Sequence, residues 1–460
     1  MNLREYANTY YKGEPHWYID EVSKYQHQQR IHKVNNLKEY LNGDHKINYL
    51  PSYKYNGKDI EPKKIILQYA KTILNFQSSF LLKNPISLTG DKKVVEAFQK
   101  VNKKAKYNRL NKKILEKVAK FGEVYEYLYL DGDEIKSYII DPTEGYPIYD
   151  HTNTLIGFIE AYIHDNISYY TVYSNEYVEQ YNNEGGEHHL VSRSINLSGL
   201  PVVYRNDNNE LNEVEGRSDL EDYIAILDNM EELLSKFTDS VHKFHNPIPV
   251  VVGQDLKGEG IDKNIVGGGI RLDLDGDFKF VTGEVDTEAF ESVYKTLLQS
   301  LLDVSSTPAV SMNKTDISNL SEVSIKLLYS LAELKAGLNE SFMRDGIEER
   351  HEKIRVLLSY VGVVFSDDVY ESLDMVFHYA MPQNEGEIIN NLKTLREIKG
   401  ISQESMLEQS PYTSNAKQEL KRLNSEKDKE DKVNMVNGQS GKADVEQGSN
   451  DGNVANKDTA

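Results

Sequence analysis

The sequence has 460 residues, no cysteine and a formal net charge of −20, and its length predicts two to four domains. The lack of cysteine excludes disulfides, thiolate nucleophiles and cysteine-ligated zinc. The acidic balance argues against a surface that grips nucleic acid broadly, because such surfaces are basic, although an acidic chain can surround nucleic acid without holding it.

Helical periodicity dominates the first 120 residues. Apolar spacing predicts one helix over 17–41, with Gly43 as its stop, and a second helix that starts at Pro62 and ends at the KNPIS stretch, 83–87. A third helix is predicted over 91–120. From Phe121 the period changes to two, and Tyr-rich alternating segments predict a β-meander to residue 181, followed by a loop at 182–189.

Residues 216–244 form the clearest predicted helix. Ser218 and Glu221 have the spacing of a capping box at its start. The helix would be about 40 Å long at 1.5 Å per residue. Five carboxylates occupy its polar positions: Asp222, Asp228, Glu231, Glu232 and Asp239. Taken alone, a charged face of this kind is usually just solvated.

A compact insert, 246–285, follows this helix and contains a predicted hairpin with Asp275-Gly276 as its turn. A helix returns over 286–304, and a small, polar, irregular stretch then separates it from a helix of more than 35 residues that starts at the capping-box-like pair Asn319 and Glu322. The last helical segment, 385–424, is interrupted by SPY at 410–412. Residues 426–460 hold no aromatic side chain and are predicted to be disordered.

Motifs of known chemistry are largely missing. The glycine-rich VGGGI, 266–270, lacks dinucleotide spacing, and LDLDGDF, 272–278, fits only the middle of a calcium loop. The histidine pairs His188-His189 and His242-x-x-His245 lack the context of a zinc site. The start MNLREYANTYYKGEPHW does not have the pattern of a signal peptide, and no apolar run approaches 18 residues. We therefore predict no catalytic site, metal, cofactor, signal peptide or membrane span, and a reducing compartment.

The order of segments resembles the portal proteins of tailed bacteriophages, of the type found in long-tailed phages of Gram-positive hosts. A long acidic helix leads into a small insert, a helix returns, and an irregular loop precedes a very long helix. Four short motifs agree with that family: Tyr40-Leu41-Asn42-Gly43, Asn84-Pro85-Ile86, Asp141-Pro142 with Tyr149-Asp150, and Asn319 to Lys326, in which Glu322 and Ser324 depart from the family pattern. The resemblance spans roughly residues 15 to 420.

The resemblance implies an α+β, mainly helical portal fold with a β-meander in its wing and a small β-hairpin in its clip. The implied division is an N-terminal helical arm of the wing over 1–60, the wing over 61–215, a stem helix over 216–245, the clip over 246–285, a second stem helix over 286–304, a tunnel loop over 305–320, a long wing helix and following strand over 321–383, a crown over 384–425 and a disordered tail over 426–460.

The resemblance also implies a function. The chain would form a ring, usually of twelve copies, at one capsid vertex of the virion, assembled in the host cytoplasm. Double-stranded DNA would pass through its channel non-specifically during packaging by a terminase and during later ejection. The implied partners are the terminase large subunit, head-completion or connector proteins, and the major capsid and scaffolding proteins. The chain itself would be neither an enzyme nor a membrane protein.

Three groups of residues are the candidate sites under this interpretation. The tunnel loop would contact the DNA backbone through Val310, Ser311, Met312, Asn313 and Lys314. The stem would place anionic rings in the channel through Asp222, Asp228, Glu231, Glu232 and Asp239, which would repel phosphate. The clip hairpin would dock the terminase or connector through Asp275, Gly276 and Asp277.

Other interpretations remain open. A structural tail or baseplate component without a DNA channel would also suit the Tyr-rich β region. A nucleic-acid-processing enzyme would need a carboxylate cluster that binds metal. For the stretch over 305–320 the alternative interpretation is a disordered surface loop.

Overall fold

The computed structural model describes residues 1–55, 58–206, 215–244, 248–253, 276–281, 285–309, 322–382, 384–413, 415–427 and 429. Two compact units are present, one formed by Met1–Asn313 with Leu328–Met381 and the other by Lys314–Leu327 with Pro382–Ala460. The fold is mixed α+β and mainly helical, as predicted.

The helices of the first unit are α1 (Leu3–Tyr11), α2 (Trp17–Val22), α3 (Tyr25–Leu41), the 3-10 turn η1 (Lys46–Tyr49), α4 (Tyr69–Leu82), α5 (Lys92–Ala105), α6 (Tyr107–Phe121), the 3-10 turn η2 (Asp219–Asp222), α7 (Ile224–Phe244), α8 (Thr287–Val304) and α10 (Asp367–Glu371). The long helix α9 (Glu322–Tyr360) begins in the second unit and continues through the first, and α11 (Glu385–Glu397) and α12 (Gln403–Gln409) belong to the second unit. The prediction of a helix of more than 35 residues is confirmed, since α9 has 39.

The predicted meander is confirmed, and it divides into two antiparallel sheets. The larger has the order β10-β9-β8-β7-β6 and the smaller the order β11-β4-β5. Their strands are β4 (Glu123–Asp131), β5 (Glu134–Ile140), β6 (Gly145–Tyr149), β7 (Leu155–His164), β8 (Ile167–Tyr173), β9 (Tyr177–Asn182), β10 (His189–Ile195) and β11 (Val202–Arg205). Three two-stranded pairs complete the described strands: β1 (Tyr53–Tyr55) with β2 (Lys58–Ile60), β12 (Ile248–Val252) with β13 (Asp277–Val281), and β3 (Ser87–Thr89) with β14 (Asp374–Val376).

Alternation along β7 explains how the sheets pack. Successive side chains of a strand point to opposite faces. Ile159 therefore joins the cluster that α1 and α2 form on one face through Leu3 and Tyr18. Its neighbour Phe158 joins the opposite cluster, where the ring of Tyr125 from the smaller sheet lies 4.8 Å away.

Three predicted helix boundaries are wrong. The helix over 17–41 is divided at Lys24, whose backbone is extended (φ −56, ψ 141). Its Nζ donates a hydrogen bond to Oε2 of Glu21 at 2.9 Å. The helix over 91–120 is divided at Lys106, which has a left-handed backbone (φ 58). The second helix begins at Tyr69 and not at Pro62, because the intervening residues run extended beside α7.

The predicted capping box and the predicted start of the helix over 286–304 agree with the structure. The capping box of Ser218 and Glu221 is present, although it opens η2, and α7 itself starts at Ile224. Asp286 caps α8, as its side chain accepts a hydrogen bond from the Ala289 N–H. The interruption at SPY, 410–412, follows the end of α12, and the second unit has a further break at Lys399 (φ 59) between α11 and α12. The predicted disordered tail lies almost wholly outside the described residues.

Candidate functional site

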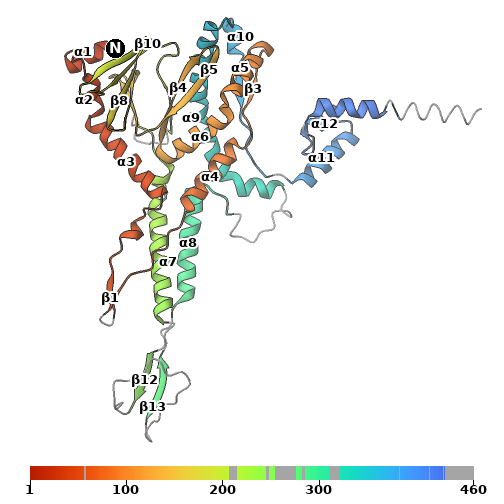
Figure 1. Cartoon of the computed structure of the whole chain (residues 1–460). Coiled ribbons are helices and arrows are strands. Elements are labelled where there is room, and N and C mark those ends of the chain that lie inside the picture. Colours follow the sequence, from red (N-terminus) through yellow and green to blue (C-terminus); the bar gives the residue numbers. More distant parts are fainter. Residues whose placement is uncertain are drawn as a thin grey trace, which may run out of the picture. The chain divides into compact units, whose positions relative to one another are not determined.

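Helices α7 and α8 lie side by side and extend away from the sheets of the first unit (Figure 1). The rings of Phe237 and Phe290 stack at 3.8 Å between centroids along the pair. Near the sheets, Leu227, Met230 and Leu301 are fully buried in a cluster that also includes residues of α3 and α4. The pair is therefore anchored at one end by a hydrophobic core.

An extended segment, residues 63–67, binds along one side of α7. The backbone N–H of Lys63 donates to the Asp239 carboxylate at 3.1 Å, and that of Ile65 donates to Ser235 Oγ at 3.0 Å. The N–H of Leu67 donates to Glu231 Oε1 at 2.8 Å. Alternate N–H groups of an extended chain are about 6.6 Å apart and side chains one helical turn apart rise about 6 Å, so the two periods match. We call residues 63–67 the strap.

Glu231 also contacts His45, in the segment that directly precedes η1. Its Oε1 lies 2.7 Å from Nδ1 of His45, whose Nε2 lies 2.9 Å from the carbonyl oxygen of Tyr40. The Tyr40 and His45 rings stack at 3.9 Å, and the side chain of Glu231 is 0% exposed. Burial raises the pKa of the Glu231 carboxyl, while the Leu67 N–H and His45 oppose that shift.

The five predicted channel-lining carboxylates differ in their burial and in their partners. The prediction for Glu231 is wrong, because that side chain is buried within a single chain. Asp239 accepts from the strap, and Asp228 is half-buried beside His45 and Lys46. The side chains of Asp222 and Glu232 are 49% and 41% exposed, and each is paired: Asp222 lies 2.6 Å from Arg217, and Glu232 bonds Lys236.

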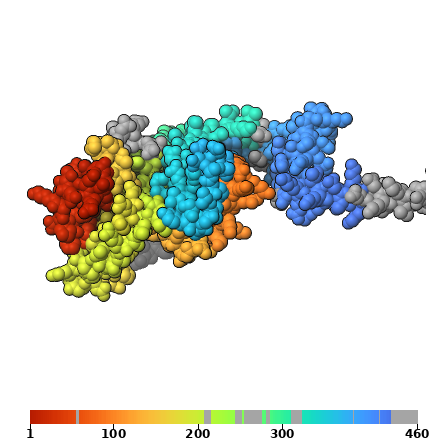
Figure 2. Space-filling model, turned by 90° about the horizontal axis from the view of Figure 1, so that it is seen from above, coloured from red at the N-terminus to blue at the C-terminus, as the bar shows by residue number. Residues whose placement is uncertain are grey.

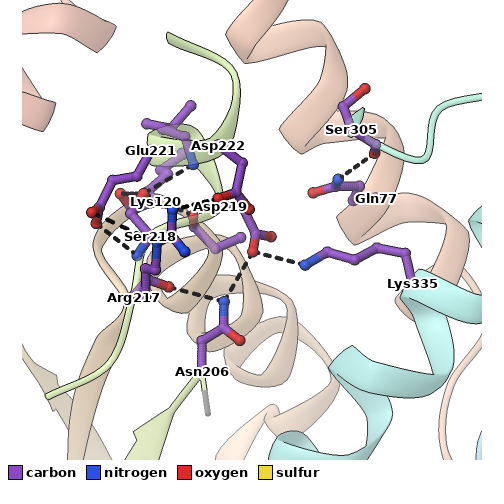
Figure 3. A network of polar contacts seen from close by, with 12 residues as sticks. Gln77, Lys120, Asn206, Arg217, Ser218, Asp219, Glu221, Asp222, Ser305 and Lys335 are labelled. Atoms are coloured by element: carbon purple, nitrogen blue, oxygen red, sulfur yellow. Dashed lines mark hydrogen bonds and ion pairs between the residues drawn. The ribbon is translucent and has the colours of Figure 1, made fainter. Parts of the chain in front are cut away.

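A polar network fixes η2, the turn that precedes α7 (Figure 3). Ser218 Oγ donates to the carbonyl oxygen of Lys120, at the end of α6, at 2.7 Å. The next residue, Asp219, accepts hydrogen bonds from Asn206 Nδ2 at 2.9 Å and from Lys335 Nζ of α9 at 2.7 Å. Four elements distant in sequence therefore converge where the stem begins.

The end of α8 is fixed beside this network. Gln77 of α4 donates from Nε2 to the carbonyl oxygen of Ser305 at 2.9 Å (Figure 3). The irregular stretch begins after this residue. Its predicted DNA-contacting residues, Val310, Ser311, Met312, Asn313 and Lys314, lie outside the described residues.

The predicted clip hairpin is described in part. Asp275 lies outside the described residues, Gly276 precedes β13, and Asp277 is the first residue of that strand. The described partner of β13 is β12, with Val252 opposite Asp277. The expected first arm of the hairpin, residues 270–274, lies outside the described residues.

Sequence reasoning missed the strap and a basic segment. The strap binds through alternate backbone N–H groups, which are present whatever the side chain. It therefore has no characteristic sequence pattern by which it could be predicted. The basic segment did have one: residues 100–113 contain seven Lys or Arg and no Asp or Glu, within a chain of net charge −20.

Comparison with known proteins decides the family. The family description "Phage portal protein, SPP1 Gp6-like" matches residues 20–433. The chain belongs to this portal family. Portal proteins are structural components of the phage virion, and the chain is accordingly a virion protein and not an enzyme.

A curated relative agrees with this assignment. The portal protein of Bacillus phage SPP1 is 21% identical over 413 residues, a match that covers 82% of this chain and 79% of that protein. Among solved structures, the neck of an empty gene transfer agent (GTA) particle computed with C6 symmetry gives a TM-score of 0.47 at 9% identity, and it covers 74% of this chain and 89% of that one. The neck of the native particle computed with C12 symmetry gives 0.43 at 10% identity, with the same coverages.

The described residues form neither a membrane-spanning helix nor a cluster of metal ligands. No described helix is long and apolar enough to cross a membrane. Within the same part of the chain, no group of three or more His, Asp or Glu side chains is placed to hold a metal ion.

Proposed function

We propose that this portal-family chain forms a ring at one capsid vertex, and that double-stranded DNA passes through the ring during packaging and ejection. The observation that carries the proposal is the family match over residues 20–433, which spans every described element from α3 to α12. The two-helix stem anchored in a mixed core supports it. The proposal includes a ring of twelve copies, the number that the resemblance implies.

In this ring α7 and α8 are the stem, and the insert with β12 and β13 is the clip. The exposed or half-buried carboxylates of the stem include Asp222 in η2, Glu232 on α7, and Glu288, Glu291 and Asp303 on α8. We propose these five as candidates for the anionic channel wall in place of the original set. A twelve-membered ring would carry 12 × −20, or −240, formal charges. Screening limits their repulsion of phosphate to about 8 Å at physiological salt, so the effect requires a narrow bore.

We assign the contacts with DNA to the tunnel loop and those with partner proteins to the clip. Residues 305–320 form the tunnel loop, in which Met312 and Lys314 touch the DNA backbone without reading bases. Asp275, Gly276 and Asp277 lie in the clip, the docking surface for the terminase large subunit and the connector proteins. Since the terminase works from outside the capsid, the clip points outward and the opposite end of the first unit faces the interior.

Capsids assembled with and without this chain test the proposal. A portal is required for DNA to enter, so capsids that lack the chain should contain no genome, and adding the chain during assembly should restore packaging. A tail or baseplate component predicts the opposite: heads full of DNA that lack tails. Filled heads in the absence of the chain would therefore reject the portal assignment and favour that alternative.

A further inference from the structure

The corner between α5 and α6 is basic on its outer side. Five exposed cations occur within 14 residues: Lys100, Lys103, Lys106, Arg109 and Lys113. None of the five forms an ion pair with a described residue, whereas the neighbouring Lys104 pairs with Glu134 and Lys117 with Asp141. We call these five residues the basic corner.

The helices of the basic corner are firmly held by their other faces. Phe98 and Val101 of α5 and Tyr107 and Ile114 of α6 are buried. Asn111 of α6 accepts a hydrogen bond from the buried Arg350 of α9 at 2.6 Å. Arg109 and Lys113 are one turn apart, and each lies about 160° around α6 from Asn111, at 100° per residue. Packing therefore orients the cations away from the body of the molecule.

The basic corner belongs to the end of the first unit opposite the stem. Phe98 of α5 packs against Tyr370 of α10 at 6.2 Å between ring centroids, and both helices lie at the end away from α7 and α8 (Figure 1). From above, the orange region that includes α5 and α6 reaches the surface next to the cyan region of α9 and α10 (Figure 2). In a portal this end faces the capsid interior, where the packaged genome collects.

We propose that the basic corner binds the phosphate backbone of double-stranded DNA on a surface outside the channel. A cluster of exposed Lys and Arg that form no ion pair with described residues is the electrostatic footprint of a phosphate-binding surface. Four of the five cations are Lys, a point charge suited to phosphate but not to bidentate base reading, so binding is independent of sequence. The position of the bound DNA inside the capsid rests on the proposed portal function, whereas the binding of DNA to the basic corner does not.

Closed circular DNA distinguishes binding at the basic corner from binding inside the channel, because a closed circle cannot thread an assembled ring. The full-length protein should bind a relaxed circular plasmid, and the observed association constant should fall steeply with salt. In the variant K103Q/R109Q/K113Q, the slope of log K against log salt should become shallower by about 3, since each lost phosphate contact changes it by roughly 1. The matched control K417Q/K421Q/K427Q removes three exposed lysines of the second unit and should bind like the wild type.

Electron microscopy of the same samples distinguishes a failure of the DNA-binding proposal from a failure of the portal proposal. Wild-type rings that do not bind circular DNA, or triple-variant rings with unchanged binding, overturn the DNA-binding surface and leave the portal proposal intact. A triple variant that fails to assemble also overturns it, because the basic corner would then contact an acidic surface of a second copy. Wild-type monomers that bind DNA through the basic corner would instead reject the ring.

Discussion

Nζ of Lys335 lies 2.7 Å from Oδ1 of Asp219, so a single ion pair joins α9 to the turn from which the stem starts. Both side chains are largely buried, with exposed fractions of 14% and 6%. Burial raises the pKa of Asp219, and the charge and hydrogen bond of Lys335 oppose that shift.

Replacing Lys335 by Met should leave the Asp219 carboxylate buried without its cation. Losing one partner of a buried pair costs about 3 kcal/mol of unfolding free energy. Protonation of Asp219 relieves this cost, so the loss should be larger at pH 8 than at pH 5 in urea unfolding followed by circular dichroism. The double variant D219N/K335M should recover part of the stability at pH 8. An equal loss at both pH values would show that the Asp219 charge is not involved.

Removing Ser235 Oγ, the acceptor on α7 that binds the middle of the strap, should release the strap locally. In Ser235→Ala the N–H of Ile65 loses its partner, at a net cost of about 1 kcal/mol, which raises the open population roughly fivefold. Trypsin should then cut faster at Lys63 or Lys64 under conditions in which the whole chain stays folded. Ser240→Ala is the matched control, because Ser240 Oγ bonds only within α7, to the carbonyl oxygen of Lys236. Identical cleavage rates for the two variants would count against the strap.

Glu21 should make the protein sensitive to acid. Burial alone would raise the pKa of Glu21, but hydrogen bonds from His27, Tyr11 and Lys24 outweigh it and lower the pKa from 4.5 to about 2. Because the pKa is lower in the folded state, the ionised group contributes stability that is present above about pH 4.5 and lost as the pH falls through 2.

The variant Glu21→Gln tests this dependence. It should be less stable than the wild type by about 3 kcal/mol at pH 7, and the difference should shrink toward pH 2. Thermal unfolding at several pH values measures it, with the exposed Glu14→Gln as control. A difference that stays constant with pH would mean that the charge of Glu21 does not stabilise the fold.

Two glycines of α9 should respond oppositely to alanine. A Cβ at Gly346 would overlap the ring of Tyr204, whereas the nearest atom to a Cβ at Gly337 is Tyr379 Oη at 3.9 Å. Gly346→Ala should therefore destabilise by about 1–3 kcal/mol through overpacking. Gly337→Ala should stabilise by up to about 1 kcal/mol through helix propensity. The denaturant midpoints of the two variants compare these effects directly. Stabilisation by both substitutions would mean that α9 lies farther from the smaller sheet than the close approach of Gly346 to Tyr204 requires.

Local signals explain what the sequence could predict. The caps at Ser218 and Asp286 involve residues two or three positions apart, so their patterns are readable. The change of period at Phe121 marks the sheets for the same reason. The order of these local elements, and not any single motif, carried the resemblance to portal proteins.

Long-range contacts explain the failures. Ile65 and Ile66 continue an apolar helical pattern, yet the N–H of Ile65 is satisfied by Ser235, 170 residues away. Glu231 looks like any acidic surface residue, and its burial depends on His45, 186 residues away. Neither partner can be found from spacing, so the strap was predicted as helix and Glu231 as channel wall.

Electron microscopy of the purified protein shows whether this chain forms a ring around a channel. We expect closed rings with a central hole, whose reconstructed inner wall at the narrow part is formed by α7 and α8 of successive copies. Symmetry averaging would give the number of copies, for which twelve is expected. Compact monomers at high concentration, or assemblies without a central hole, would contradict the account.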